Sequence, residues 1–214
     1  MLSGLIWDFD GTIVDTETPQ YRAWSEIFAE YGDELTPADW GRIVGTWGDV
    51  DLIDILMARV PGVPRLETNR RAGALVTQYM LEAPLRDGVM ALLEAAHHAH
   101  IPQAIASSSH RVWIQAFLQL HHLEAYFGAL ATADDVTMGK PDPAVYRVAV
   151  SRLAIEAARA VAIEDSPHGS TAALGAGLKC VVVPNPSTEA LLFPDGVVRL
   201  PSLQGVTLEA LAAL

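Results

Sequence analysis

The sequence predicts an α/β fold in which a doubly wound parallel sheet carries an inserted helical domain. Five short apolar runs are each followed by polar or glycine-rich residues, and helical patterns separate them. Only the stretch from about residue 16 to 81 breaks this alternation, because it contains helix starts but no convincing strand. With 214 residues, half of them hydrophobic, the chain is long enough for one such domain and an insert.

The predicted strands, in chain order, lie in GLIWD, PQAIAS, GALAT, AVAIED and KCVVVPN. Contiguous apolar runs of this length are typical of strands that are buried on both faces of a sheet. We assign residues 1–15 and 82–214 to the α/β core domain and residues 16–81 to the helical domain. The two connections, near residues 14–18 and 82–86, are the expected hinges.

Four helices are expected in the inserted segment. Thr18 and Pro19 are typical of an N-cap and a first helical residue, and Gly32 is the expected end of that helix. Thr36 and Pro37 open a second helix in the same way. The segments DVDLIDILMARV and ETNRRAGALVTQYMLEA supply the third and the fourth.

Charge and composition exclude several classes of function. Acidic residues outnumber basic ones 26 to 14, and the resulting net charge of −12 argues against a nucleic-acid partner. No window reaches the roughly 18 apolar residues of a membrane span, and no signal-peptide pattern begins the sequence. The single cysteine, Cys180, lies in an apolar run, which suits a buried thiol in a reducing compartment. We therefore expect a cytoplasmic monomer or homodimer that binds neither nucleic acid nor a membrane.

Reactive side chains follow the predicted strands or stand between them. They are Asp8 and Asp10 after LIW, Ser107 after AIA, Lys140 in GKPDP, and Glu164 and Asp165 after AVAI. In open α/β sheets the ligand crevice lies at the carboxyl ends of the strands, so these groups are expected to meet there.

Two carboxylates at one strand end suit phosphoryl transfer, which needs both a nucleophile and a group that moves protons. We expect Asp8 to be the nucleophile, because a carboxylate can attack a phosphoryl group and the resulting acyl phosphate is readily hydrolysed. Gly11 lets the chain turn, so that Asp10 can protonate the leaving alkoxide and later deprotonate the attacking water. The pair could instead cap a turn, but the other reactive segments favour catalysis.

The charge balance of this crevice predicts a cation. Asp8, Glu164 and Asp165 would repel a phosphate dianion, and Mg²⁺ is the hard cation that a few carboxylate oxygens hold. Lys140 adds a fixed positive charge. The expected phosphate contacts come from Ser107, Ser108, Lys140, Gly11 and Thr12, helped by backbone amides at a helix start, where Ser109 is the expected cap.

In this order, the segments DFDGT, IASSS, GKPDP and IEDSPHG resemble the four motifs of the haloacid dehalogenase (HAD) superfamily. The insert is similar to the helical cap of the subfamily I branch that contains phosphoglycolate phosphatase and β-phosphoglucomutase. The resemblance implies a Rossmann-like core with the Asp8 strand at its centre. It also implies a magnesium site made by the Asp8 carboxylate, the Asp10 backbone carbonyl and Asp165, with Glu164 nearby.

Single residues help to separate the activities of this superfamily. Dehalogenases generally lack the second aspartate, so Asp10 argues against that activity. Phosphonatases use a cap lysine, but the only lysines, Lys140 and Lys179, lie outside the insert. A mutase of the β-phosphoglucomutase type is expected to carry a histidine near position 20 and an arginine near position 48, where this chain has Gln20 and Gly48.

The expected function is a Mg²⁺-dependent phosphatase that hydrolyses a small phosphorylated metabolite, a sugar phosphate or a phosphoglycolate-like acid, through an aspartyl-phosphate intermediate. The alternatives are the mutase and a non-catalytic phosphate-binding protein. Candidate substrate contacts are Glu17 and Gln20 at the start of the first inserted helix, His110 after the serines, and Trp47. Trp47, in GTWGD, either shapes the substrate pocket or packs within the insert.

Overall fold

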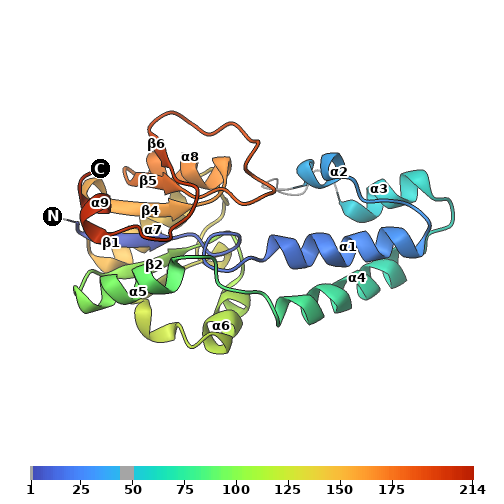
Figure 1. The fold of residues 1–214 in the computed structure, drawn as a ribbon, viewed down its shortest axis with the longest axis horizontal. Coiled ribbons are helices and arrows are strands. Elements are labelled where there is room, and N and C mark those ends of the chain that lie inside the picture. Colours follow the sequence, from blue (N-terminus) through green and yellow to red (C-terminus); the bar gives the residue numbers. More distant parts are fainter. Residues whose placement is uncertain (1, 44–50) are drawn as a thin grey trace. The chain divides into compact units, whose positions relative to one another are not determined.

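The structure is a computed structural model that describes residues 2–43 and 51–214 (Figure 1). The chain divides into a core unit, Met1–Val14 with Leu85–Leu214, and an inserted unit, Asp15–Pro84. Trp47 and Gly48 lie outside the described residues. Among the helices that are described, none is both long and apolar enough to cross a membrane.

The core unit is built on a parallel sheet of six strands in the order β3-β2-β1-β4-β5-β6 (Figure 1). The strands are β1 (Gly4–Trp7), β2 (Gln103–Ala106), β3 (Ala129–Ala131), β4 (Ala160–Glu164), β5 (Lys179–Val182) and β6 (Val197–Arg199). The first five are the five apolar runs, so the predicted doubly wound α/β fold is confirmed. In β1, Leu5 pairs with Gln103 on one side and with Val161 on the other, which places this strand inside the sheet.

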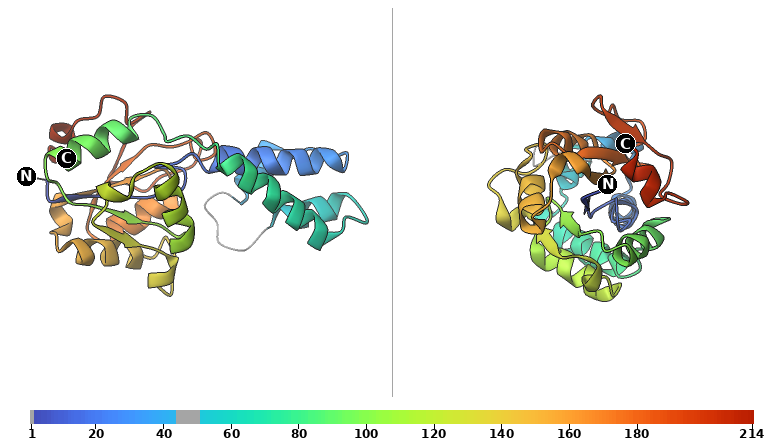
Figure 2. Two further views of the ribbon diagram at one scale, coloured as in Figure 1. Left: turned by 90° about the horizontal axis from the view of Figure 1, so that it is seen from below. Right: turned by 90° about the vertical axis from the view of Figure 1, so that its left-hand side faces the viewer.

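Helices cover both faces of the sheet (Figure 2). They are α5 (Val89–His98), α6 (Arg111–Leu120), α7 (Ala144–Leu153), α8 (Pro167–Gly175) and α9 (Leu208–Ala212), with single turns η1 (Glu124–Tyr126), η2 (Ala133–Asp135) and η3 (Ala157–Arg159). On one face, Ile6 and Cys180 pack in a cluster with Tyr146 of α7 and Ala172 of α8. Successive side chains of a strand point to opposite faces, so Trp7 lies on the other one.

A buried glutamine holds this second face together. The side chain of Gln103 on β2 accepts a hydrogen bond from the Trp7 indole at 3.0 Å and donates to the Leu93 carbonyl of α5 at 3.1 Å. Both polar ends of the buried amide are therefore satisfied, which avoids the cost of an unpaired polar group in the core.

The inserted unit contains the four predicted helices, which are α1 (Glu17–Glu30), α2 (Pro37–Gly41), α3 (Leu52–Arg59) and α4 (Arg65–Met80). Its core includes Ile27 and Phe28 of α1, Leu56 of α3 and Leu75 of α4. The helix α2 begins as predicted, because the Thr36 side chain accepts from the amide at the third helical residue in a capping box.

The predicted start of α1 is wrong by two residues. The helix begins at Glu17 rather than at Pro19, with Thr16 at the N-cap position. The side chain of Asp15 accepts a hydrogen bond from the Thr18 amide at 3.1 Å, and this satisfies one of the unpaired amides of the first turn. Pro19 is tolerated there because it lies within that first turn.

The chain leaves and re-enters the core unit at one point. Val14 and Leu85 form an isolated antiparallel bridge, and the amide of Asp15 donates to the Pro84 carbonyl at 3.0 Å. The two ends of the inserted unit therefore lie next to each other.

Candidate active site

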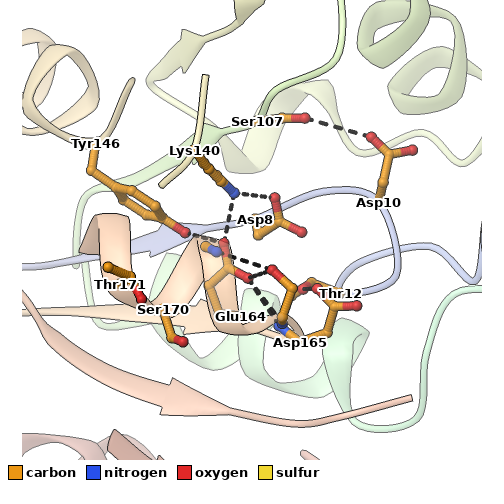
Figure 3. Close-up of polar contacts among 12 residues, drawn as sticks. Asp8, Asp10, Thr12, Ser107, Lys140, Tyr146, Glu164, Asp165, Ser170 and Thr171 are labelled. Atoms are coloured by element: carbon orange, nitrogen blue, oxygen red, sulfur yellow. Dashed lines mark hydrogen bonds and ion pairs between the residues drawn. The ribbon is translucent and has the colours of Figure 1, made fainter. Parts of the chain in front are cut away.

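The carboxyl ends of the central strands carry a cluster of charged side chains (Figure 3). Asp8 directly follows β1 and is 6% exposed, Glu164 ends β4 and is fully buried, and Asp165 comes next. Lys140 approaches from the loop between η2 and α7, and its side chain is 8% exposed. These four residues, predicted from three separate segments, meet in one place.

Lys140 links the two buried carboxylates. Its ammonium donates to Oδ1 of Asp8 and, at 2.6 Å, to Oε1 of Glu164. The hydroxyl of Tyr146 donates to the same Glu164 oxygen at 2.6 Å, and the ammonium lies 5.0 Å from the centre of the Tyr146 ring. Oδ2, the other oxygen of Asp8, accepts no hydrogen bond from the described residues. One oxygen of Asp8 is thus held by a cation while the second is available for chemistry.

Burial and charge shift the proton equilibria of this cluster. Burial raises the pKa of Asp8 to about 7; Lys140 opposes the rise and Glu164 adds to it. Burial alone would lower the pKa of Lys140, but the carboxylates of Asp8 and Glu164 outweigh it and raise that pKa above its ordinary value. Burial also raises the pKa of the Tyr146 phenol well above its usual range. Lys140 therefore stays charged, and the ionised form of Asp8 depends on positive charge around it.

The second oxygen of Glu164 organises the turn after β4. Oε2 accepts hydrogen bonds from the amide of Asp165 at 3.1 Å, the amide of Ser166 at 3.3 Å and the Ser166 hydroxyl at 3.1 Å. A Cβ atom at position 169 would collide with the Glu164 carboxylate, so Gly169 is what lets α8 come so close. Both oxygens of Glu164 are engaged in hydrogen bonds.

Asp165 is held by two neutral donors. The hydroxyl of Thr12 donates to Oδ1 at 3.3 Å, and the side-chain amide of Asn185 donates to Oδ2 at 2.7 Å. Gly11 has a φ of +78°, and a Cβ there would lie 2.5 Å from Oδ2 of Asp165, so both its backbone and its surroundings require glycine. Thr12 and Gly11, expected as phosphate contacts, lie against Asp165.

The acidic cluster suits a hard divalent cation. Asp8, Glu164 and Asp165 each offer a carboxylate oxygen, these oxygens lie within 4.8 Å of one another, and all three residues are buried. Oxygen donors of this kind are those that Mg²⁺ prefers over softer metals. Glu164 is the least suited of the three to bind the ion directly, because one of its oxygens faces the Lys140 ammonium and both accept hydrogen bonds. Asp8 keeps Oδ2 without a hydrogen bond from the described residues, and the donors to Asp165 named above, Thr12 and Asn185, are neutral.

Asp10 has different neighbours. It is half-buried beyond the end of β1. Its Oδ2 accepts from the Ser109 hydroxyl at 2.5 Å and from the Ser107 hydroxyl at 3.5 Å, while its Oδ1 accepts from the Trp113 indole N–H at 3.2 Å. All three donors are neutral and come from the segment between β2 and the first turns of α6.

The start of α6 is not capped as expected. The hydroxyl of Ser109 is directed to Asp10, His110 occupies the N-cap position, and Asp134 accepts from the Arg111 amide at 2.8 Å. His110 is largely exposed and its Nδ1 lies 2.6 Å from Asp134. The structure therefore pairs His110 with Asp134 and not with the acidic cluster.

The remaining predicted residues lie in two places. Ser107 is buried and accepts from the Ser109 amide at 3.0 Å, and Ser108 beside it is half-buried. Glu17 and Gln20 lie in the first turns of α1, in the inserted unit. Trp47 is outside the described residues.

Four polar residues of the site were not predicted from the sequence. Tyr146, Trp113 and Asn185 are described above, and the fourth is Arg86. The Arg86 guanidinium donates to the carbonyls of Gly11 at 2.6 Å, Val183 at 2.7 Å and Pro184 at 2.9 Å. It thereby ties the turn after β1 to the loop after β5, which are the segments that carry Thr12 and Asn185.

Comparison with known proteins identifies the family. A model of the haloacid dehalogenase-like hydrolases matches residues 5–183. YhcW of Bacillus subtilis (strain 168) is 37% identical over 99% of this chain and 96% of its own length, and a phosphorylated carbohydrates phosphatase of Thermotoga maritima is 29% identical over 93% and 94%. CbbY from Rhodobacter sphaeroides in complex with phosphate superposes with a TM-score of 0.80 and 28% identity over all of both chains. A CbbY mutant in complex with xylulose-(1,5)bisphosphate gives a TM-score of 0.79 and 28% identity over 99% of each.

The chain belongs to the haloacid dehalogenase-like hydrolase family. The resemblance seen in the four motifs is thereby confirmed, and the expected enzyme class, a phosphoric monoester hydrolase, agrees with the phosphatases among its relatives.

Proposed function

We propose that the protein is a Mg²⁺-dependent phosphatase that hydrolyses a small phosphomonoester, a sugar phosphate or a phosphoglycolate-like acid, through an aspartyl-phosphate intermediate. One observation carries the proposal: two carboxyl groups with different surroundings lie two residues apart. Asp8 is buried and faces the Lys140 ammonium, whereas Asp10 is half-buried and accepts hydrogen bonds from neutral donors. The sugar-phosphate class is supported by the phosphorylated carbohydrates phosphatase and by the CbbY complexes with phosphate and with a sugar bisphosphate.

In the first step Asp8 attacks phosphorus through Oδ2, the oxygen that does not face Lys140. The bond from phosphorus to the ester oxygen breaks, and Asp10 gives its proton to the departing alkoxide. Lys140 holds Oδ1 of Asp8 in place and offsets the charge of the phosphoryl group. Ser107 and Ser108, at the end of β2, are the proposed hydroxyl and amide contacts of that group.

In the second step a water molecule attacks the phosphorus of the aspartyl phosphate. Asp10, now ionised, takes a proton from this water, and the bond between phosphorus and Asp8 breaks. Phosphate leaves, and both aspartates return to their starting states.

The proposed ligands of Mg²⁺ are the carboxylates of Asp8 and Asp165 and the backbone carbonyl of Asp10. Bound there, the ion supplies positive charge that offsets the carboxylates and the phosphate and favours the ionised form of Asp8. Thr12 and Asn185 hold Asp165 in orientation. Glu164 acts indirectly, by holding Lys140.

The inserted unit, Asp15–Pro84, is the proposed cap domain. A cap that closes over a small substrate excludes unpositioned water and selects the leaving group. Glu17, Gln20 and Trp47 are proposed substrate contacts on this side, and His110 on the core side. Such a lid disfavours macromolecular substrates.

The test is phosphate release from a panel of sugar phosphates, sugar bisphosphates and phosphoglycolate, with and without Mg²⁺. Wild type is compared with Asp8→Asn and with the control Asp195→Asn, whose carboxyl is exposed in the loop before β6. We expect metal-dependent release that falls by about four orders of magnitude or more in Asp8→Asn and is unchanged in the control.

Two other outcomes would replace the proposal. Interconversion of glucose 1-phosphate and glucose 6-phosphate that is faster than phosphate release would establish a mutase. A folded protein that binds phosphate analogues but turns over no ester would be a binding protein.

A further inference from the structure

The two oxygens of the Asp10 carboxyl meet donors of different kinds. The Trp113 indole donates to Oδ1 at 3.2 Å, whereas Oδ2 lies 2.5 Å from the Ser109 hydroxyl and 3.5 Å from the Ser107 hydroxyl. An indole N–H can only donate, while a hydroxyl can either donate or accept. Oδ1 must therefore be an acceptor in every protonation state of Asp10, and a proton on Oδ2 costs no hydrogen bond.

The indole is braced so that it keeps this geometry. The Trp113 ring packs edge-on against Phe117, with centroids 4.8 Å apart, and Phe117 packs against Phe9 at 6.0 Å. Phe9 is fully buried and stands between the two aspartates in the chain. Aromatic contacts of this kind fix ring orientation as well as burying area. The Trp113 ring is thus packed, through Phe117, against the turn after β1 that carries the Asp10 carboxyl.

The hydroxyl on the other side is fixed through its backbone. The amide of Ser109 donates to the Ser107 side chain at 3.0 Å, and its carbonyl accepts from the Ala133 amide at 3.1 Å. The Ser109 side chain can still rotate its hydroxyl hydrogen, so it donates to an ionised Asp10 and accepts from a neutral one. Oδ2 consequently keeps a partner through both halves of the reaction.

We propose that Trp113 is a positioning residue that assigns the transferable proton of Asp10 to Oδ2. This rests on the proposed function. When the ester is cleaved, the O–H bond at Oδ2 breaks and its proton goes to the alkoxide oxygen, whose bond to phosphorus also breaks. When the intermediate is hydrolysed, a proton passes from water to the same Oδ2. Without the indole N–H, the proton can also occupy Oδ1, the oxygen that does not face the serines.

Substrates whose leaving groups differ in basicity can distinguish a role of Trp113 in proton transfer from a purely structural role. Departure of an alkoxide from a sugar phosphate requires a proton from Asp10, whereas p-nitrophenolate is stable as an anion and leaves without one. The ratio kcat/KM reports the steps up to departure of the leaving group, so it isolates the acid role of Asp10 from its later role as a base.

The experiment compares kcat/KM for the best sugar phosphate and for p-nitrophenyl phosphate. In Trp113→Phe, which keeps the ring against Phe117 and removes the N–H, we expect a fall of about 10- to 100-fold for the sugar phosphate and of less than about threefold for the nitrophenyl ester. Asp10→Asn should show a larger gap, and Ser109→Ala a smaller one in the same direction. Val112→Ala, an exposed neighbour on α6, is the control and should show none.

An equal fall for both esters, or no fall for either, overturns the assignment. A second readout needs no turnover: the ¹⁵N–¹H signal of the Trp113 indole, identified by its loss in Trp113→Phe, must shift in Asp10→Asn, and an unmoved signal also overturns it. The two possible failures are distinguishable. A wild-type protein that cleaves neither ester overturns the proposed function, whereas wild-type turnover with equal falls overturns only the role of Trp113.

Discussion

Asp8 and Asp10 lie two residues apart at the end of one strand, yet their surroundings have little in common. Asp8 is buried and faces the Lys140 ammonium, which also binds the Glu164 carboxylate. Asp10 is half-buried, and its partners are one indole and two hydroxyls, all of them neutral.

The difference separates a cluster of buried charges around Asp8 from the proposed proton-transfer site at Asp10. A change at Asp8 alters the balance among several buried charges, and buried charges depend strongly on their partners. When the charge of Asp10 changes, its partners are all neutral, and the two hydroxyls among them can reverse their hydrogen bonds. The chain thus places the proposed nucleophile and the proposed proton carrier next to each other without giving them the same environment.

Removing the Lys140 ammonium should have the largest effect. In Lys140→Met, two buried carboxyls lose their shared positive partner, and breaking such a buried pair costs about 3–5 kcal/mol of unfolding free energy. We expect that loss in urea unfolding with EDTA, together with near-complete loss of phosphate release. The control is Lys179→Met, which changes the only other lysine, at the start of β5. Equal losses in the two variants would contradict the role of Lys140.

Asp10→Asn should separate activity from stability. The variant keeps a group of the same shape among neutral donors, so we expect the unfolding free energy to change by less than about 1 kcal/mol. Phosphate release from a sugar phosphate should fall by about 10²- to 10⁴-fold, the usual contribution of a general acid or base. Parallel urea titrations and phosphate assays check both numbers. A loss of stability like that of Lys140→Met would remove the contrast between the two aspartates.

A third variant tests the proposed metal site beside Asp8. Asn185 donates to Oδ2 of Asp165 at 2.7 Å, and loss of such a supporting hydrogen bond typically weakens metal affinity or activity about 10- to 100-fold. Asn185→Ala should therefore raise the Mg²⁺ concentration that gives half-maximal activity, with maximal activity largely restored at high Mg²⁺. Ser187→Ala, in the same loop, is the matched control. An unchanged Mg²⁺ requirement in Asn185→Ala would show that Asp165 needs no such support.

The last prediction concerns the pH dependence of the metal-free protein. Burial raises the pKa of Asp8 from 3.8 to about 7, so between these values the unfolded chain has lost a proton that the folded protein keeps. Raising the pH through this window therefore favours unfolding, by at most about 1.4 kcal/mol per pH unit for one proton. In EDTA, wild type should lose stability relative to Asp8→Asn from pH 4 to about 7. A difference that does not vary with pH would contradict the raised pKa.

The strands were predictable because, in a chain that alternates strands and helices, an apolar run of four or five residues between polar segments is most often a buried strand. The exception is β6, a three-residue strand whose residues are half-buried or exposed, which leaves no apolar run to detect. The predicted start of α1 was wrong because the side chain of Asp15, and not that of Thr18, accepts a hydrogen bond from an amide of the first turn.

Most of the site could be predicted because its residues lie at the carboxyl ends of the strands. That rule brought Asp8, Glu164 and Asp165 to one crevice, and it applied equally to Asn185, which follows β5 closely and was not predicted. Lys140 lies in the loop between η2 and α7, and its GKPDP segment predicted it. Tyr146 and Trp113 are different. Each is one aromatic residue on an amphipathic helix, and only the three-dimensional packing reveals that its polar end meets a carboxylate.

The backbone bridge between Val14 and Leu85 has a consequence for how such a chain can diversify. Because the segment Asp15–Pro84 begins and ends at neighbouring points, its length and sequence can change without altering the spacing that the sheet requires. Selection for a new leaving group can then act on that segment by insertion, deletion or exchange. The proposed catalytic carboxylates and lysine lie in the other unit, so changes in the inserted segment can alter the choice of substrate while the proposed reaction stays the same.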